Sequence, residues 1–144
     1  MAKKVVYLSG PMTGIENYNY PMFNEVAREV RELGHRVINP AEFYGGHGDR
    51  TRQEYMHKSV QALLNSTNVI LLPGWRDSKG CTLEVAIAQE IGLVIQEYVT
   101  EEMVEAKRRE LIAEQEDAAL DAQEAETANL ESLNEIKEDA EQPA

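Results

Sequence analysis

Four short apolar runs limit what the first hundred residues of this chain can fold into. They lie at residues 4–8, 35–40, 68–72 and 93–99. The runs are rich in β-branched residues, which is typical of buried strands. Between them, apolar residues recur at helical spacing, at about residues 21–33, 51–66 and 82–91. This alternation predicts an α/β domain over residues 1–99, with a mostly parallel sheet and helices on both of its faces.

The last part of the chain has a different character. Residues 101–144 contain 15 Asp and Glu against 4 Lys and Arg, whereas residues 1–100 contain 11 against 10. No Gly or Pro occurs in this part before Pro143, so its helix propensity is high. We expect residues 100–144 to form an acidic helical extension that packs on the domain or on a partner through its first turns. Beyond about residue 118 we expect it to be solvated or partly disordered, with a dimerising coiled coil as the alternative.

Composition argues against several kinds of protein. A chain without a broad basic surface is a poor partner for duplex nucleic acid. A single cysteine and no cluster with metal-ligand spacing predict no disulfide, no metal and no cofactor. No stretch approaches the about 20 apolar residues that span a membrane, and Lys3-Lys4 precede only a short apolar run. We therefore expect no signal peptide and a soluble, cytoplasmic protein.

The stretch from Leu72 to Glu84 carries the clearest functional signal. An apolar run ends at Pro73-Gly74, polar and glycine residues follow, and a helical pattern begins at Thr82. A strand, a loop at its carboxyl end and a first helical turn form the crevice in which open α/β sheets bind ligands. Glu84 lies where the helix dipole favours an ionised carboxylate. On position alone, it is equally well a favourable first-turn acid.

Two other loops are candidates for the same crevice. Ser9-Gly10-Pro11-Met12-Thr13-Gly14 follows the first strand, and its glycines permit close approach of a ligand, although a plain strand–helix turn is the alternative. Next, Tyr18 and Tyr20 lie in a connection too long for a minimal turn. Three roles are open for these two tyrosines: to line a base pocket, to contact another subunit, or merely to cover the edge of the sheet. In the loop at residues 41–50, His47 is either an acid–base group or a solvated side chain.

Four segments occur together in a characteristic order: Tyr7–Gly14, Tyr18–Phe23, Val37–Glu42 and Leu71–Trp75, followed by Ser78, Gly80 and Glu84. Together they resemble the nucleoside 2-deoxyribosyltransferase-like proteins, in particular the small branch common in phages and bacteria. The likeness covers about residues 4–97. It implies a flavodoxin-like or Rossmann-like domain that acts on a deoxynucleoside or its 5′-monophosphate. It also implies a homo-oligomer in which a neighbouring subunit completes the active site.

The resemblance implies a role for each site residue. A glutamate at the position of Glu84 attacks C1′ of the sugar, which suits the oxocarbenium-like transition state of retaining glycosyl chemistry. The loop Ser9–Gly14 lies against sugar and base, while Ser78 and the N–H groups that follow it bind a 5′-phosphate. The crevice also includes Asn39, Pro40, Gly74, Trp75, Gly80 and Cys81. Trp75 either stacks on a base or closes the loop, and Cys81 is either a thiol of lowered pKa or a packing residue; we favour the structural role for both.

The chain departs from the family where a second carboxylate is expected. Ser59 stands at the position of an Asp that positions the sugar or assists proton transfer, and Thr67 stands where relatives often have another. A hydroxyl cannot replace a carboxylate as an acid or base near neutral pH. Asp77 supplies the missing group, or the acid step is weaker, or catalysis has been lost and binding kept. Asp77 beside Ser78 also leaves the choice between nucleoside and monophosphate open, although the position of Ser78 favours the monophosphate.

Three functions therefore compete. We favour an enzyme that cleaves or transfers an N-glycosidic bond through a glycosyl ester on Glu84, with water or a second base as the acceptor. The second is a nucleotide-binding module without chemistry. The third is an interaction protein that works through its acidic tail.

Overall fold

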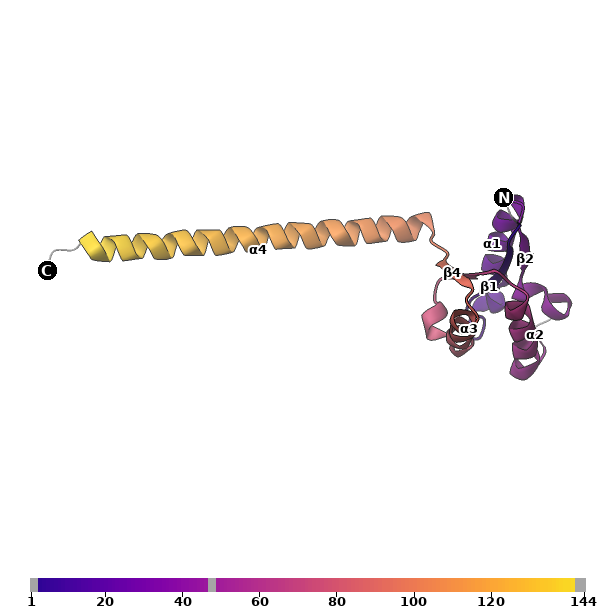
Figure 1. Ribbon diagram of the computed structural model, residues 1–144. Helices are drawn as coiled ribbons and strands as arrows, with labels where there is room; N and C mark the ends of the chain where they lie inside the picture. The colour runs from indigo at the N-terminus through magenta and orange to yellow at the C-terminus, as the bar shows by residue number, and fades with distance from the viewer. Residues whose placement is uncertain (1–2, 47–48, 142–144) are drawn as a thin grey trace. The chain divides into compact units, whose positions relative to one another are not determined.

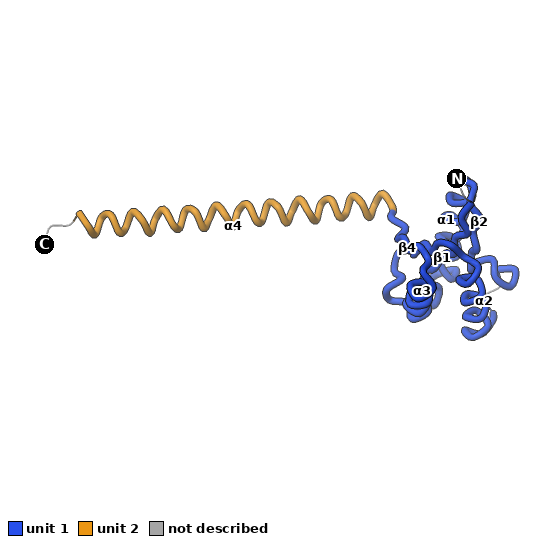
Figure 2. Tube along the Cα trace, viewed as in Figure 1, with its two compact units in different colours: residues 1–99 blue, residues 100–144 orange. Residues whose placement is uncertain are grey.

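The computed structural model describes residues 3–46 and 49–141, so His47 lies outside the described residues. The chain divides into two compact units, residues 1–99 and 100–144 (Figure 2). The first unit is built on a four-stranded sheet with the order β2-β1-β3-β4, in which all neighbours are parallel. The strands are β1 (Val5–Ser9), β2 (Arg36–Ile38), β3 (Asn68–Leu71) and β4 (Val94–Glu97) (Figure 1). The predicted parallel α/β sheet is confirmed.

Three helices connect the strands and cover both faces of the sheet: α1 (Tyr20–Glu32), α2 (Arg52–Leu64) and α3 (Lys79–Glu90). Side chains of a strand alternate between its two faces. On one face, Val6 and Leu8 of β1 pack against α1. On the other face, Tyr7 packs in a cluster with residues of α2 and α3. Residues of β1 belong to both clusters, so helices pack against both faces of this strand.

The beginnings of α2 and α3 are set by side-chain caps. Thr51 Oγ1 accepts the N–H of Glu54 at 3.2 Å, and Glu54 Oε2 accepts the N–H of Thr51 at 2.9 Å. This capping box follows from the sequence alone. By contrast, α3 begins at Lys79, three residues before the predicted start, because Ser78 Oγ accepts the N–H of Cys81 at 3.3 Å. Gly80 in the first turn concealed this start.

The connections contain short 3₁₀ segments where the sequence predicted loops, at Glu16–Asn19, Pro40–Gly46 and Trp75–Asp77. In the first of them, Asn17, Tyr18 and Asn19 all have positive φ angles, of 53°, 54° and 63°. A left-handed backbone is rare for tyrosine because its Cβ crowds the following carbonyl group. Such strain is typical of functional segments, and here it lies immediately before α1.

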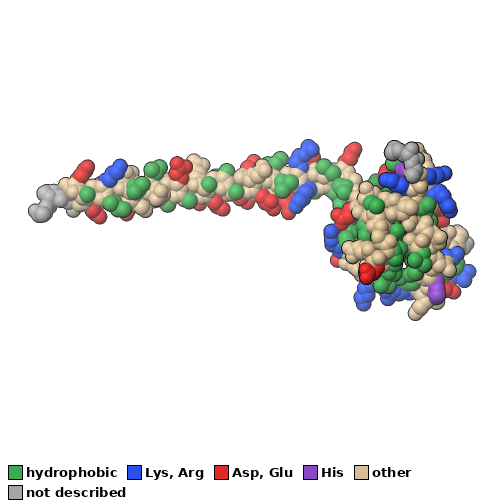
Figure 3. Space-filling model, in the orientation of Figure 1, with side chains coloured by type: hydrophobic (Ala, Val, Ile, Leu, Met, Phe, Trp, Pro, Cys, Tyr) green, Lys and Arg blue, Asp and Glu red, His purple; other side chains and the backbone are tan. Residues whose placement is uncertain are grey.

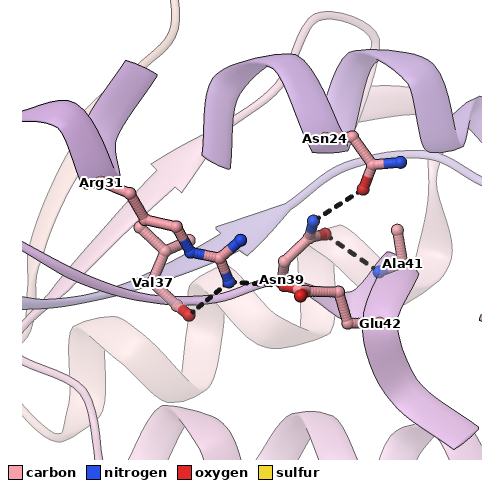
Figure 4. A network of polar contacts seen from close by, with 6 residues as sticks. All are labelled: Asn24, Arg31, Val37, Asn39, Ala41 and Glu42. Atoms are coloured by element: carbon pink, nitrogen blue, oxygen red, sulfur yellow. Dashed lines mark hydrogen bonds and ion pairs between the residues drawn. The ribbon is translucent and has the colours of Figure 1, made fainter. Parts of the chain in front are cut away.

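A polar network fixes the end of β2 (Figure 4). The buried Asn39 donates from Nδ2 to Asn24 Oδ1 of α1 at 2.9 Å and accepts the N–H of Ala41 at 3.0 Å. Nearby, the Arg31 guanidinium donates to Val37 O at 3.2 Å and pairs with Glu42. The segment after β2, which includes Pro40, is therefore tied to α1.

The second unit is one helix, α4 (Glu101–Glu141), and every described residue of it is exposed. Acidic side chains are spread along it among isolated apolar ones (Figure 3). The helix continues beyond residue 118, where a solvated or partly disordered helix was expected, because no Gly or Pro interrupts it. None of the helices in the described ranges combines the length and the apolarity needed to cross a membrane.

Candidate active site

A cavity of about 410 Å³ lies at the carboxyl end of β1, and residues at the start of α3 and in α2 also line it. Many residues that the sequence singled out line it: Gly10, Met12, Thr13, Tyr18, Tyr20, Pro40, Ser78, Gly80, Cys81 and Glu84. The volume is in the range of small-molecule sites, and the place is where open α/β sheets bind ligands. The structure thus brings the loop after β1 and the start of α3 to one cavity.

Glu84 is the most unusual group in this cavity. Its side chain points inward from the second turn of α3, the residue is only 7 % exposed, and Oε2 is buried without a hydrogen-bond partner. Burial raises the pKa of the carboxyl group to about 7, and the nearby hydroxyl groups of Tyr7 and Ser9 oppose this rise. Glu84 is therefore not a solvated first-turn acid. A buried carboxylate with a perturbed pKa in a cavity is typical of functional sites.

Tyr7 and Ser59 form a buried pair beside Glu84. The Tyr7 hydroxyl donates to Ser59 Oγ at 2.9 Å, and both side chains line the cavity. Burial and the charge of Glu84 raise the pKa of Tyr7 well above its ordinary value. Ser59, at the position where the resemblance implies an Asp, thus accepts a hydrogen bond from a phenol. The sequence analysis missed Tyr7, since a tyrosine in an apolar run reads as core.

The start of α3 leaves room beside the carboxylate. A Cβ placed on Gly80 would lie 3.8 Å from Ser78 Oγ and 4.0 Å from Glu84 Oε1. The first backbone N–H groups of a helix have no partner within the helix and attract anions. Ser78, Gly80 and Glu84 thus bring the N-terminal end of α3 and a carboxylate to the same cavity.

Gly10 has a packing role that the sequence did not predict. A Cβ at this position would lie 2.9 Å from Leu72 Cβ and 3.0 Å from Phe23 Cζ, which is too close. The missing side chain lets the loop after β1 lie directly on Leu72 and Phe23. Gly10 thus allows a loop that lines the cavity to pack closely on the hydrophobic core.

The cavity also has a cationic side that the sequence analysis missed. Arg50 and Arg52 flank the cap of α2 and line the cavity. The Arg50 guanidinium lies 4.7 Å from the centre of the Tyr44 ring and 3.8 Å from Glu54. Further lining residues outside the prediction are Leu8, Phe23, Tyr55 and Met56. A crossover from β2 brings α2 here, and only the sheet order reveals it.

Several predicted site residues lie outside the cavity lining: Ser9, Pro11, Gly14, Asn39, Gly74, Trp75 and Asp77. Asp77, the expected source of a second carboxylate, is exposed and does not line the cavity. The Trp75 indole donates to Glu97 Oε1 at 2.8 Å and lies under the Arg76 guanidinium, which fits the loop-closing role. Ser9 is buried at the end of β1, and its Oγ has no partner. Within residues 3–46 and 49–141, no group of three His, Cys, Asp or Glu could hold a metal ion.

The fold and the cavity define a small α/β protein with a buried carboxylate at the carboxyl edge of a parallel sheet. The chain belongs to the family described as a domain of unknown function (DUF4406), whose model matches residues 4–97. No curated protein matches the chain. The family match covers the strands, the first three helices and the whole cavity, and it leaves α4 outside.

Proposed function

We propose that this domain cleaves or transfers the N-glycosidic bond of a deoxynucleoside 5′-monophosphate, or of the deoxynucleoside, with Glu84 as the nucleophile. The observation that carries the proposal is the buried Glu84, whose unpartnered oxygen lies in a cavity of about 410 Å³. The likeness to nucleoside 2-deoxyribosyltransferase-like proteins supports it, because a glutamate at this position is the nucleophile there.

The proposed reaction needs one ionised carboxylate at the sugar. Glu84 attacks C1′, the bond from C1′ to the base nitrogen breaks, and a glycosyl ester forms. Water or a second base then attacks C1′ and releases Glu84, which gives hydrolysis or transfer. Since the pKa of Glu84 is about 7, its ionised fraction rises through neutral pH, and the first step should accelerate with it.

The start of α3 supports the monophosphate over the nucleoside. Ser78 and Gly80, at the start of α3, line the same cavity as Glu84, and Gly80 leaves space beside the carboxylate. A phosphate there would meet the positive end of the helix dipole. The sugar would then lie over Glu84, since C1′ and the 5′-phosphate belong to one deoxyribose.

The direct test is release of free base from the four common deoxynucleoside 5′-monophosphates, followed by chromatography. Glu84→Gln keeps the shape of the side chain and should slow release by about a thousandfold or more. Glu90→Gln, on the exposed part of α3, is the matched control and should leave the rate unchanged. Acid-quenched wild-type protein should gain the mass of one deoxyribosyl phosphate. Undiminished release by Glu84→Gln would exclude the mechanism.

A second candidate is a nucleotide-binding module without chemistry, and the hydroxyl of Ser59 is the observation that favours it. A binding module would gain thermal stability from nucleotides in both wild-type and Glu84→Gln protein while releasing no base. Sedimentation measurements would check the expected homo-oligomer in the same samples.

A further inference from the structure

The cavity is lined by fewer acidic side chains than basic ones. Among the described residues that line it, Glu84 is the only carboxylate, and Arg50 and Arg52 are the cations. If Glu84 is the nucleophile, as proposed above, it must be ionised and cannot also deliver a proton. The departing base then takes the electron pair of the broken C1′–N bond with no carboxylic acid beside it.

The other polar side chains among the described lining residues are poor proton donors. They carry hydroxyl, thiol and guanidinium groups, whose ordinary pKa values lie above 7. Burial raises the pKa of the Tyr7 phenol and of the Cys81 thiol further. The hydroxyl of Ser59 already accepts the Tyr7 hydrogen bond at 2.9 Å. General acid catalysis by these groups is therefore weak near neutral pH.

Arg52 offers a different kind of assistance. It is the first residue of α2, it is exposed, and it lines the cavity. Arg50 lies near Glu54 and on the Tyr44 ring, whereas no ion pair joins Arg52 to an acid in the described part of the chain. A guanidinium keeps its charge and donates hydrogen bonds in its plane, but it does not give up a proton.

The sheet order relates the two elements that carry Arg52 and Ser78. The chain runs from β2 to α2 and from β3 to α3, and β1 lies between β2 and β3. Strands β2 and β3 are therefore two strand spacings, about 10 Å, apart, and Arg52 of α2 and Ser78 before α3 line the same cavity. A nucleotide with its phosphate at Ser78 and its sugar at Glu84 would extend its base across β1 towards Arg52.

We propose that the base leaves as an anion held by the Arg52 guanidinium, so that the protein selects bases by the stability of that anion. Glu84 forms the bond to C1′, and the electron pair of the C1′–N bond moves to the base. Water then attacks C1′ of the ester, the bond from C1′ to Glu84 breaks, and the proton of that water neutralises the base through solvent. The preferred substrates are the oxopurine deoxynucleotides, because xanthine and hypoxanthine form more stable anions than adenine or cytosine.

The test measures single-turnover base release at saturating substrate with the xanthine, hypoxanthine, adenine and cytosine deoxynucleoside 5′-monophosphates. The stability of each base anion follows the acidity of the ring N–H in the free base. In wild-type protein the rate of base release should fall steeply as this N–H becomes less acidic. Arg52→Gln should slow the adenine and cytosine substrates about 10- to 100-fold, and the xanthine substrate less. Arg76→Gln, an exposed arginine outside the cavity, is the matched control and should change none of the rates.

Two further variants test whether the base leaves as an anion or is protonated by a general acid elsewhere in the protein. Ser59→Asp should flatten the dependence on the base by supplying a proton donor, whereas His47→Gln should leave the dependence unchanged. A flat dependence in wild-type protein, an equal effect of Arg52→Gln on all four bases, or a steeper dependence in His47→Gln would each overturn the anionic departure alone. No release from any substrate would overturn the proposed function with it.

Discussion

Glu84 in α3 and the acids of α4 carry similar side chains in opposite surroundings. Glu84 is buried between the sheet and α2, and burial raises its pKa to about 7. The carboxylates of α4 are exposed, and some pair with Lys or Arg one turn away, as Glu110 does with Lys107 at 2.9 Å. Such surface pairs contribute little to stability, because water and salt screen them. Removal of water, more than the presence of an acid, distinguishes the cavity from the surface of α4.

The largest expected difference between the two regions concerns apolar side chains. Phe23 is fully buried between α1 and the sheet, whereas Leu130 of α4 is 56 % exposed. Phe23→Ala should lower the free energy of unfolding of the domain by about 3–5 kcal/mol, since it leaves a cavity. Leu130→Ala should change it by less than about 0.5 kcal/mol. Urea unfolding followed by Trp75 fluorescence measures both. A comparable loss in Leu130→Ala would mean that α4 is part of the folding unit.

The next prediction concerns pH. In the folded protein the Glu84 carboxyl has a pKa of about 7, against an ordinary value of 4.5. Between these values the folded state binds more protons than the unfolded chain, so its stability falls as pH rises from about 4.5 to about 7. Glu84→Gln removes this loss. Relative to wild type, it should therefore gain up to about 3 kcal/mol on going from pH 4 to pH 8. Glu124→Gln in α4 is the control, and an equal pH dependence of the two variants would contradict the buried carboxylate.

Gly10 tests the packing of the loop after β1 against the open surface of α4. Gly10→Ala forces a methyl group against Leu72 and Phe23 and should cost about 1–3 kcal/mol, as overpacking does. Ala119→Gly in α4 should reduce helicity with no effect on the domain. Thermal unfolding and circular dichroism separate the two effects. A Gly10→Ala protein of unchanged stability would show that the loop can move off Leu72.

The smallest effect is expected from removing the second unit. Deletion of residues 100–144 should change the stability of the domain by less than about 0.5 kcal/mol, because no described residue of α4 is buried. Base release should also be unchanged. A large loss of release on deletion would favour the alternative in which the acidic tail is the working part.

The sheet and the helices follow from periodicity, and the carboxyl-edge crevice follows from the parallel order. Glu84 and Ser78 could be found because both lie near one strand end in the sequence. Tyr7 could not, because a strand run shows that a side chain is buried but not that its hydroxyl reaches a polar group. Arg52 could not, because its helix reaches the cavity through a crossover that only the observed strand order reveals.

Asp77 shows a limit of another kind. Its neighbour Ser78 lines the cavity, but the 3₁₀ turn at Trp75–Asp77 leaves the Asp77 side chain in solvent. Two adjacent residues thus have different surroundings, and no spacing in the sequence encodes this difference. The second carboxylate expected from the family pattern is therefore not found at Asp77.

The asparagine at the end of β2 also bears on how this protein ages chemically. Deamidation of an asparagine begins when the backbone nitrogen of the next residue attacks the side-chain amide. Asn39 is followed by Pro40, which has no N–H to lose, and its amide is held by Asn24 and Ala41. The residue that ties α1 to the wall of the cavity is thus protected from the slow reaction that would give it a charge.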